Sequence, residues 1–433
     1  MTSRGRASVL AVILALPLLA APSLTGAQPA DTTPAQPPAA PAAAPTPDNT
    51  AATVFDEVWR TVNEHFYDAT FGGHDWAAIG DRYRPLVASA PTLAARKDAI
   101  NRMLGELGAS HTGYLTREDP AYYDIADIFS GALRRELPKF FPDGEVAYDG
   151  IGVFTEPFDG KIFVSGLLAD LPGATAGLRT GDEIVAADGA AFDPIASFAG
   201  KADKTVTLAI RREAGGPTQD IAVTPRRIRP NEAFLNAIKA SARIIEQGPR
   251  KIGYIHIWSY GRWEDERAFE EAISTGPLKD ADALVWDLRD GWGGTAEPSY
   301  LNIFNLRGPV MTTTNHAGES HIVNVKWRKP VVLLINGGTR SAKEILAYGF
   351  KKYGYGPVVG TRTKGDVLAA RAYMLSDGSI LELAIDDVRV DGERIEGVGV
   401  GPTVEVPFTL QYSAGADPQL ERAVEIAAQT PNG

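Results

Sequence analysis

The chain of 433 residues contains no cysteine. It can therefore form no disulfide bond, carry no lipid on a thiol and use no thiol nucleophile. It also lacks a long basic run, because 54 acidic residues outnumber 43 basic ones and the formal net charge is -11. Such a chain is a poor partner for nucleic acid or for an anionic membrane surface. The composition favours a globular protein with apolar cores, which a hydrophobic content of 44% can fill.

Long apolar runs are scarce as well, and the main one lies near the N-terminus. The apolar run over residues 9–21 follows Arg4 and Arg6 and precedes small residues, so residues 1–27 are predicted to be a signal peptide. A membrane span needs about 20 apolar residues, and this run is shorter. We expect export to the periplasm or the medium without stable membrane insertion, although retention of the signal as an anchor stays open. The Pro- and Ala-rich residues 28–50 predict a disordered linker.

The folded part is expected to open with helices. Apolar residues recur every four positions in 53–66 and with helical spacing in 93–107, which predicts an N-terminal helical domain over 51–116. Gly108 fits the end of the second helix, and Ser110-His111 follow it in a polar turn. None of the six histidines has the spacing of a metal site, so we expect neither a metal nor another cofactor.

Strand and helix patterns alternate over 231–410, which predicts an α/β core with helices packed on a sheet. Later residues favour β-hairpins that turn at 377–378 and 391–392. Residues 411–433 are predicted to form a separate C-terminal segment. The expected elements of the core are strands over 251–260, 283–288 and 330–336, a helix over 264–274 and a second helix after Ser341.

Ser341 lies where an apolar strand ends and an amphipathic helix begins. A serine in this position is exposed at the sheet edge, and the helix N-terminus offers N-H groups and partial positive charge to an oxyanion. The same residues also fit a capping box, in which Ser341 and Glu344 only satisfy the first N-H groups of the helix. The local sequence is compatible with both roles.

Residues 145–228 are predicted to form a small β-rich unit. Its glycine-rich opening, Gly150-Ile151-Gly152-Val153, would expose adjacent N-H groups beside a strand edge, which suits capture of a peptide carboxylate. Residues 172–184 and the turn at 187–189 resemble the PDZ domain of bacterial proteases. The alternative is an ordinary β module without a ligand.

Three motifs of the core resemble the C-terminal processing peptidase and tricorn core protease family of serine peptidases: Asp287–Gly294, Asn336–Glu344 and Val359–Gly365. The resemblance implies an α/β multidomain protein with a ClpP/crotonase-like core and a mixed sheet. It also implies that Ser341 is the nucleophile and that unstructured polypeptides, recruited in part through their C-termini by the PDZ unit, are the substrates. A homo-oligomer is compatible with the family.

The family activates its serine with either a lysine or a histidine. The processing-peptidase branch uses a lysine in a Gly-Lys-Gly context, but here Asp366 follows Gly365 and Lys364 precedes it. Lys364 therefore stays an alternative base. The tricorn-like branch uses an upstream histidine with a serine before it and a distant glutamate, which the resemblance assigns to His111, Ser110 and Glu396. The family's oxyanion hole is carried over to the N-H groups of Ala342 and of Gly293 or Gly294.

Two non-peptidase functions are compatible with the same sequence. The protein would be a non-catalytic scaffold if the PDZ unit bound peptides and the core served only as a platform. A carrier of lipophilic molecules is suggested by the retinoid-binding relatives of the family, but no ligand motif of theirs is identifiable here. The candidate acid-base residues favour a serine peptidase that works through an acyl-enzyme.

Overall fold

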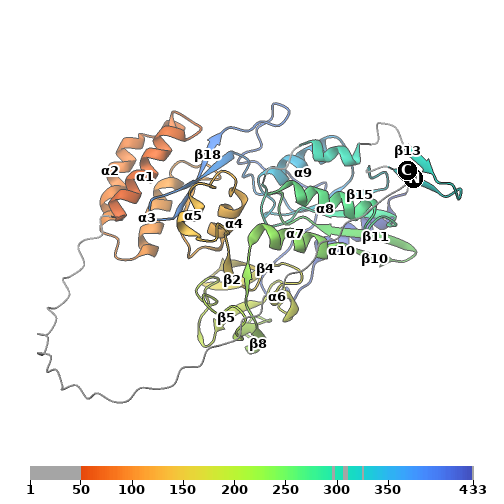
Figure 1. Cartoon of the computed structure of the whole chain (residues 1–433), viewed down its shortest axis with the longest axis horizontal. Helices are drawn as coiled ribbons and strands as arrows, with labels where there is room; N and C mark the ends of the chain where they lie inside the picture. Colours follow the sequence, from red (N-terminus) through yellow and green to blue (C-terminus); the bar gives the residue numbers. More distant parts are fainter. Residues whose placement is uncertain (1–49, 295–297, 306–310, 324–325, 432–433) are drawn as a thin grey trace, which may run out of the picture. The chain divides into compact units, whose positions relative to one another are not determined.

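A computed structural model describes residues 50–294, 298–305, 311–323 and 326–431 (Figure 1). The predicted signal peptide and all but the last residue of the predicted linker lie outside these residues. Within the described part, no helix has both the length and the apolar character that crossing a bilayer requires. No group of three or more described histidine, aspartate or glutamate side chains is arranged to hold a metal ion.

The first part of the described chain is helical, as predicted. The helices α1 and α2 lie side by side, as do α2 and α3 (Figure 1), and Val54, Val58 and Val62 of α1 are fully buried. The elements of this part are α1 (Thr50–His65), the 3-10 helix η1 (Phe71–Gly73), α2 (Trp76–Ala88), α3 (Leu93–Gly105), β1 (Gly113–Leu115), α4 (Pro120–Ile128) and α5 (Leu137–Phe140).

This part is not purely helical, however. The strand β1 pairs antiparallel with β18 (Ile380–Asp386), which pairs in turn with β17 (Ala369–Met374). Leu381 and Leu383 of β18 share a buried cluster with apolar side chains of α1 and α3. The first predicted hairpin is therefore confirmed, and it packs with the N-terminal helices although it follows them by about 270 residues.

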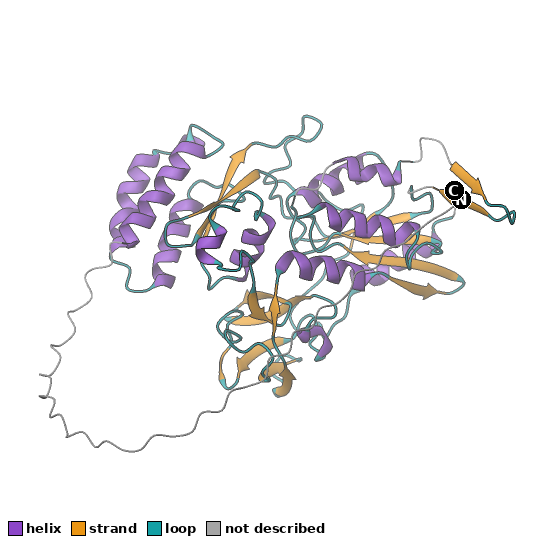
Figure 2. Ribbon diagram, viewed as in Figure 1, coloured by secondary structure: helices purple, strands orange, loops and turns teal. Residues whose placement is uncertain are grey.

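Residues 148–228 form an antiparallel sheet with a core of its own (Figure 2). The strand order is β3-β4-β5-β7-β8, so β3 is an edge strand, and β2 pairs separately with β9. The elements are β2 (Tyr148–Gly150), β3 (Val153–Phe158), β4 (Lys161–Leu167), α6 (Pro172–Thr175), β5 (Glu183–Ala187), β6 (Ala190–Ala191), β7 (Val206–Arg211), β8 (Gln219–Val223) and β9 (Arg226–Ile228).

The core sheet is mixed, as the resemblance implies. Its order is β10-β11-β12-β15-β16-β19, with β10 antiparallel to β11 and the other pairs parallel. The strands are β10 (Arg243–Gln247), β11 (Arg250–His256), β12 (Ala283–Asp287), β15 (Val331–Ile335), β16 (Val358–Gly360) and β19 (Val404–Glu405), and the helices are α7 (Pro230–Ser241), α8 (Trp263–Ser274), α9 (Ala342–Lys352) and α10 (Pro418–Gln429).

Both faces of the core sheet are covered. Leu333 and Ile335 of β15 pack with side chains of α7, α8 and α9. Val332 and Leu334, which alternate with them, pack with Ala423 and other residues of α10. Because α10 completes the second layer, the core extends to Gln429, and the boundary that we predicted at residue 410 lies too early.

Two smaller regions complete the description. The predicted hairpin around 391–392 consists only of an isolated bridge between Val390 and Glu393. Before it along the chain lie the 3-10 helix η2 (Pro298–Phe304) and a hairpin of β13 (Met311–Thr314) and β14 (Ser320–Val323).

Candidate active site

Ser341 occupies a sharp turn between β15 and α9. Its φ of 59° and ψ of -135° are unusual for a residue with a side chain, and such strain persists only where the surroundings enforce it. Here the Ser341 N-H donates to the Asp366 carbonyl at 2.7 Å. Gly293 packs so closely that a Cβ on it would lie 2.3 Å from the Ser341 Cβ. The turn thus fixes the serine between two neighbouring loops.

The predicted capping box does not form. The Ser341 side chain makes no capping hydrogen bond, and the Glu344 carboxylate turns to the loop after β16. It accepts from the Thr363 hydroxyl at 2.5 Å and from the N-H groups of Gly365 and Asp366 at 2.7 and 2.8 Å. Glu344 is fully buried and serves as a tie between α9 and this loop. The Ser341 hydroxyl is left without a hydrogen-bond partner among the described residues.

The loop after β12 is tied to the serine turn by polar side chains. Asn336 donates from Nδ2 to the Asp290 carboxylate at 2.9 Å, and its Oδ1 accepts from the Asp290 N-H at 3.2 Å. Lys343, which is fully buried, donates to the carbonyls of Asp290 and Trp258 at 2.7 and 3.3 Å. Burial lowers the pKa of Lys343 to about 7. These contacts hold the glycines of the 291–294 segment against Ser341.

Ser110, His111 and Glu396 meet in one hydrogen-bonded chain. The Ser110 Oγ lies 3.0 Å from the His111 Nδ1 and donates to the Glu396 carboxylate at 2.9 Å. The same carboxylate accepts from the N-H groups of Ser110, Val367 and Leu368. Since the Ser110 hydroxyl has one proton and gives it to Glu396, the His111 Nδ1 must carry a proton and the Nε2 is free to accept one.

His111 and Ser341 line the same cavity of about 330 Å³. Both residues are described, and no hydrogen bond joins the imidazole to the serine hydroxyl. Resting enzymes often hold such pairs apart until substrate binds. Apolar side chains make up most of the remaining wall: Ile125, Ile128, Phe129, Trp292, Ile345, Val367, Leu368 and Val388. The cavity thus brings a hydroxyl and an imidazole together in apolar surroundings.

Three backbone N-H groups near Ser341 donate to no described acceptor. They belong to Ala342, the first residue of α9, and to Gly293 and Gly294, all of which line the cavity. A helix N-terminus leaves its first N-H groups unpaired by construction. Together with the positive end of the α9 dipole they could stabilise an oxyanion.

The remaining predicted residues lie outside this cavity. The Lys364 ammonium is about half exposed, forms an ion pair with Asp366 at 2.5 Å and lines a separate cavity. Gly150, Ile151, Gly152 and Val153 form the turn between β2 and the edge strand β3, where Gly152 has a φ of 71°. The structure therefore groups His111 with Ser341 and leaves Lys364 apart from them.

Sequence reasoning missed several residues of the cavity wall. Residues 117–144 were assigned to no domain, yet α4 supplies Ile125 and Ile128, and Asp124 of the same helix accepts the Trp292 indole N-H at 2.9 Å. Burial raises the pKa of Asp124 to about 7. Glu382 of β18 also lines the cavity, and burial raises its pKa despite the opposing effect of His111 nearby. The sequence signal that could have identified Glu382 is its charge, because it interrupts the apolar run 380–384.

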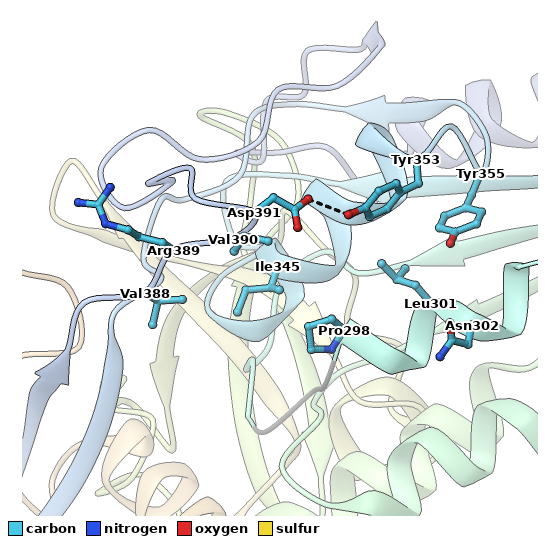
Figure 3. A pocket seen from close by; sticks show the side chains of 11 residues that line it. Pro298, Leu301, Asn302, Ile345, Tyr353, Tyr355, Val388, Arg389, Val390 and Asp391 are labelled. Carbon is cyan, nitrogen blue, oxygen red and sulfur yellow. Dashed lines mark hydrogen bonds between the residues drawn. The ribbon is translucent and has the colours of Figure 1, made fainter.

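A second, mostly apolar cavity of about 380 Å³ adjoins the first along α9 (Figure 3). Ile345 and Val388 line both cavities. Tyr353 and Tyr355 stand at its far end, where the Tyr353 hydroxyl donates to Asp391 at 2.8 Å (Figure 3). Gly349 and Leu301 are packed together in the wall of this cavity, because a Cβ on Gly349 would lie 2.5 Å from the Leu301 side chain. The two cavities are therefore neighbours beside α9, separated by the side chains of Ile345 and Val388.

A strained serine at a helix start, near an imidazole whose outer nitrogen is free, is the layout of a serine hydrolase. Comparisons with known proteins agree with this class. Residues 251–406 match the model of peptidase family S41, and residues 47–105 match that of the tricorn protease C1 domain. The chain thus carries a peptidase family S41 domain and a tricorn-type C1 domain, and its relatives are named C-terminal processing and tricorn proteases, which are serine-type peptidases.

Individual relatives agree with these matches, and a solved structure shares the fold. The chain is 29% identical to tricorn protease homolog 1 of Streptomyces coelicolor, over 86% of this chain and 35% of that protein. It is 27% identical to the chloroplastic C-terminal processing peptidase of Tetradesmus obliquus, over 82% of this chain and 76% of that protein. The crystal structure of the tricorn protease shares the fold, with 20% identity, a TM-score of 0.51 and coverage of 87% of this chain and 36% of that one. The chain thus spans about a third of the length of its tricorn-type relatives.

Proposed function

We propose that the protein is a serine peptidase in which Ser341 is the nucleophile and His111 the general base. The observation that carries this proposal is the chain from Glu396 through Ser110 to His111, which ends in the cavity that Ser341 lines. Such a chain fixes the imidazole tautomer and supports the positive charge that develops on the ring. A histidine with only a structural role would not need an unpaired nitrogen beside an unpaired serine hydroxyl.

The first half of the reaction forms an acyl-enzyme. The Nε2 of His111 takes the Ser341 proton while the Oγ attacks the carbonyl carbon of the scissile bond. The resulting oxyanion would be bound by the N-H groups of Ala342 and of Gly293 or Gly294. The imidazolium then gives its proton to the leaving amine as the C-N bond breaks.

The second half restores the enzyme. Water gives a proton to the His111 Nε2 and attacks the ester carbon, and the same N-H groups bind the second oxyanion. The Ser341 oxygen leaves with the proton from His111, and the product carries a new carboxylate. No step requires a group other than the substrate, water and these residues.

The two neighbouring cavities favour an extended polypeptide as substrate. Ile345 lies four helical residues from Ser341, about 6 Å along the axis, and Gly349 lies about 12 Å away. An extended peptide advances about 3.3 Å per residue. The second cavity therefore suits an apolar side chain about two to four residues from the scissile bond.

The β-rich unit supports substrate recognition of the PDZ type. β3 is an edge strand with unpaired backbone groups on one side, and a peptide could add to it as a further strand. The N-H groups of Ile151 and Gly152 just before it donate to no described acceptor and could bind a C-terminal carboxylate. We propose that this unit recruits peptide ends, and that the whole protein acts after export, as the N-terminal sequence predicts.

The test is to compare the parent with Ser341→Ala. The parent should cleave an unstructured protein such as reduced casein and should be labelled by a serine-directed fluorophosphonate. Ser341→Ala should do neither and should keep its thermal unfolding temperature, because the hydroxyl makes no hydrogen bond within the described part of the chain. Ser299→Ala is a matched control that should retain cleavage. If the parent is not labelled and cleaves nothing, the peptidase proposal is wrong and the scaffold interpretation is favoured.

A further inference from the structure

Arg340 directly precedes Ser341. Only one of its guanidinium N-H groups, that of Nε, donates a hydrogen bond to a described residue. The Nε donates to the Gly291 carbonyl at 3.0 Å, and the Cζ lies 3.9 Å from the centre of the Trp292 ring. The terminal amino groups have neither a hydrogen-bond acceptor nor an ion-pair partner among the residues that the structure describes. The side chain is thus held in a fixed plane while most of its N-H donors stay unused.

Arg340 stands where the catalytic cavity meets the edge strand of the β-rich unit. It lines the catalytic cavity together with Ser341. It also lines two cavities, of about 760 and 270 Å³, whose walls include Phe154 and Thr155 of β3. A peptide that ran from β3 toward Ser341 would therefore pass the guanidinium.

Glu382, Asp366, Asp124 and Asp290 attract the Arg340 guanidinium through space, but in the described part of the chain none of these carboxylates forms an ion pair with it. The Asp290 carboxylate accepts from Asn336 instead. The nearby Asp366 is paired with Lys364, and Asp124 accepts from the Trp292 indole. Glu382 lines the catalytic cavity but forms no ion pair with Arg340. Keeping a charge partly away from water without a partner is costly. A carboxylate ligand would remove that cost, because the planar fork of a guanidinium matches a carboxylate bidentately.

We propose that Arg340 binds a carboxylate of the peptide substrate beside the bond that Ser341 attacks. The carboxylate is either the C-terminal α-carboxylate or the side chain of an aspartate or glutamate. This inference rests on the proposed peptidase function and adds a substrate class to it: peptides that present a negative charge within a few residues of the scissile bond.

The experiment uses matched peptides and the full-length protein. An internally quenched peptide that the parent cleaves is made with Glu or Gln at each position around the cleavage site, and with a free or an amidated C-terminus. KM and kcat are measured for the parent, Arg340→Gln, Arg340→Lys and Arg243→Gln. Arg243 is the matched control, because it also stacks on an aromatic ring and donates to one backbone carbonyl, but it is exposed on β10.

The parent should prefer the peptide with a carboxylate at one position by about tenfold, mainly through KM. Arg340→Gln should lose this preference, Arg340→Lys should keep part of it, and Arg243→Gln should keep all of it. A preference for Glu over Gln identifies a side chain as the ligand, whereas a preference for the free C-terminus identifies the α-carboxylate.

Two results would overturn the proposal. One is equal cleavage of charged and neutral peptides by the parent. The other is an equal loss for both peptides in Arg340→Gln, which would mean that Arg340 only positions Trp292 and the Gly291 loop. Anisotropy measurements of the same peptides bound to Ser341→Ala test the carboxylate site even if no peptide is cleaved. If the carboxylate peptides do not bind but the fluorophosphonate still labels the parent, the carboxylate inference is wrong. The peptidase proposal would then still stand.

Discussion

Ser341 and His111 line one cavity but are held in contrasting ways. The turn at Ser341 is built from neighbouring core segments, because Gly293 and Asp366 belong to loops after β12 and β16, the strands that flank β15, and Glu344 belongs to α9, which ties to the second loop. His111 lies in no helix or strand and depends on Glu396, whose contact with Ser110 spans 286 positions of the chain. The proposed nucleophile is thus positioned by the core, whereas the proposed base is positioned by a contact between distant segments.

This difference teaches that the two halves of the site can fail separately. Changes at the base or its support should leave the Ser341 turn and its N-H groups in place. Residual rate enhancement from binding and oxyanion stabilisation is expected in such variants, as in other serine hydrolases. The variants below test this separation.

The largest effect in this set is expected from His111→Ala. Removal of the base should lower kcat/KM by about 10³-fold or more, and Lys364→Ala should stay within about twofold of the parent because its ammonium is paired outside the cavity. Steady-state kinetics on one peptide measures both variants. An inactive Lys364→Ala with an active His111→Ala would assign the base to the lysine.

A smaller effect is expected from Glu396→Gln. One carboxylate oxygen becomes an amino group that faces the N-H or hydroxyl donors of Ser110, Val367 and Leu368, so the support of His111 weakens. We expect kcat to fall by about 10²-fold and the unfolding free energy to fall by about 1–3 kcal/mol. Glu393→Gln is the control, an exposed carboxylate on the same loop. Unchanged kcat in Glu396→Gln would show that the relay plays no part.

The smallest effect is expected on the pH dependence of stability, through Asp124 of α4. Burial raises the pKa of Asp124 from 3.8 to about 7, so the folded protein binds this proton more tightly than the unfolded chain does. The associated stability is fully present below pH 3.8 and is lost as the pH rises through 7. The melting temperature of the parent relative to Asp124→Asn should therefore fall between pH 4 and 8. A difference that is constant across this range would contradict the shift.

The core elements could be predicted because their signals are local. The apolar runs of β12 and β15 and the periodicity of α1 and α8 appear where we expected them. The position of Ser341 at a strand end and helix start follows from the same patterns. The histidine and glutamate came only from the family resemblance, since nothing in the spacing of residues 111 and 396 indicates that they meet.

The parts that sequence reasoning missed depend on tertiary contacts. Glu344 fits a capping box in sequence, but three donors of the 363–366 loop bind its carboxylate in the fold. β1 is only three residues long and gains its strand character by pairing with β18. Glu382 of β18 lines the cavity, and Asp124 of α4 bonds the Trp292 side chain that lines it, although these elements are far apart in the chain. Local patterns contain no information about such partners.

The large sequence separation between Ser110 and Glu396 also determines when the site can form during synthesis. A chain is made from its N-terminus, so residues 110 and 341 are both synthesised before residue 396 exists. Until then, the imidazole lacks its support, although β18, the strand with which β1 pairs, has already been made. The growing chain would carry a serine without a positioned base, and we expect hydrolytic competence to arise only when the last tenth of the protein is made. The connectivity of the fold would thus delay activity without a pro-segment or an inhibitor.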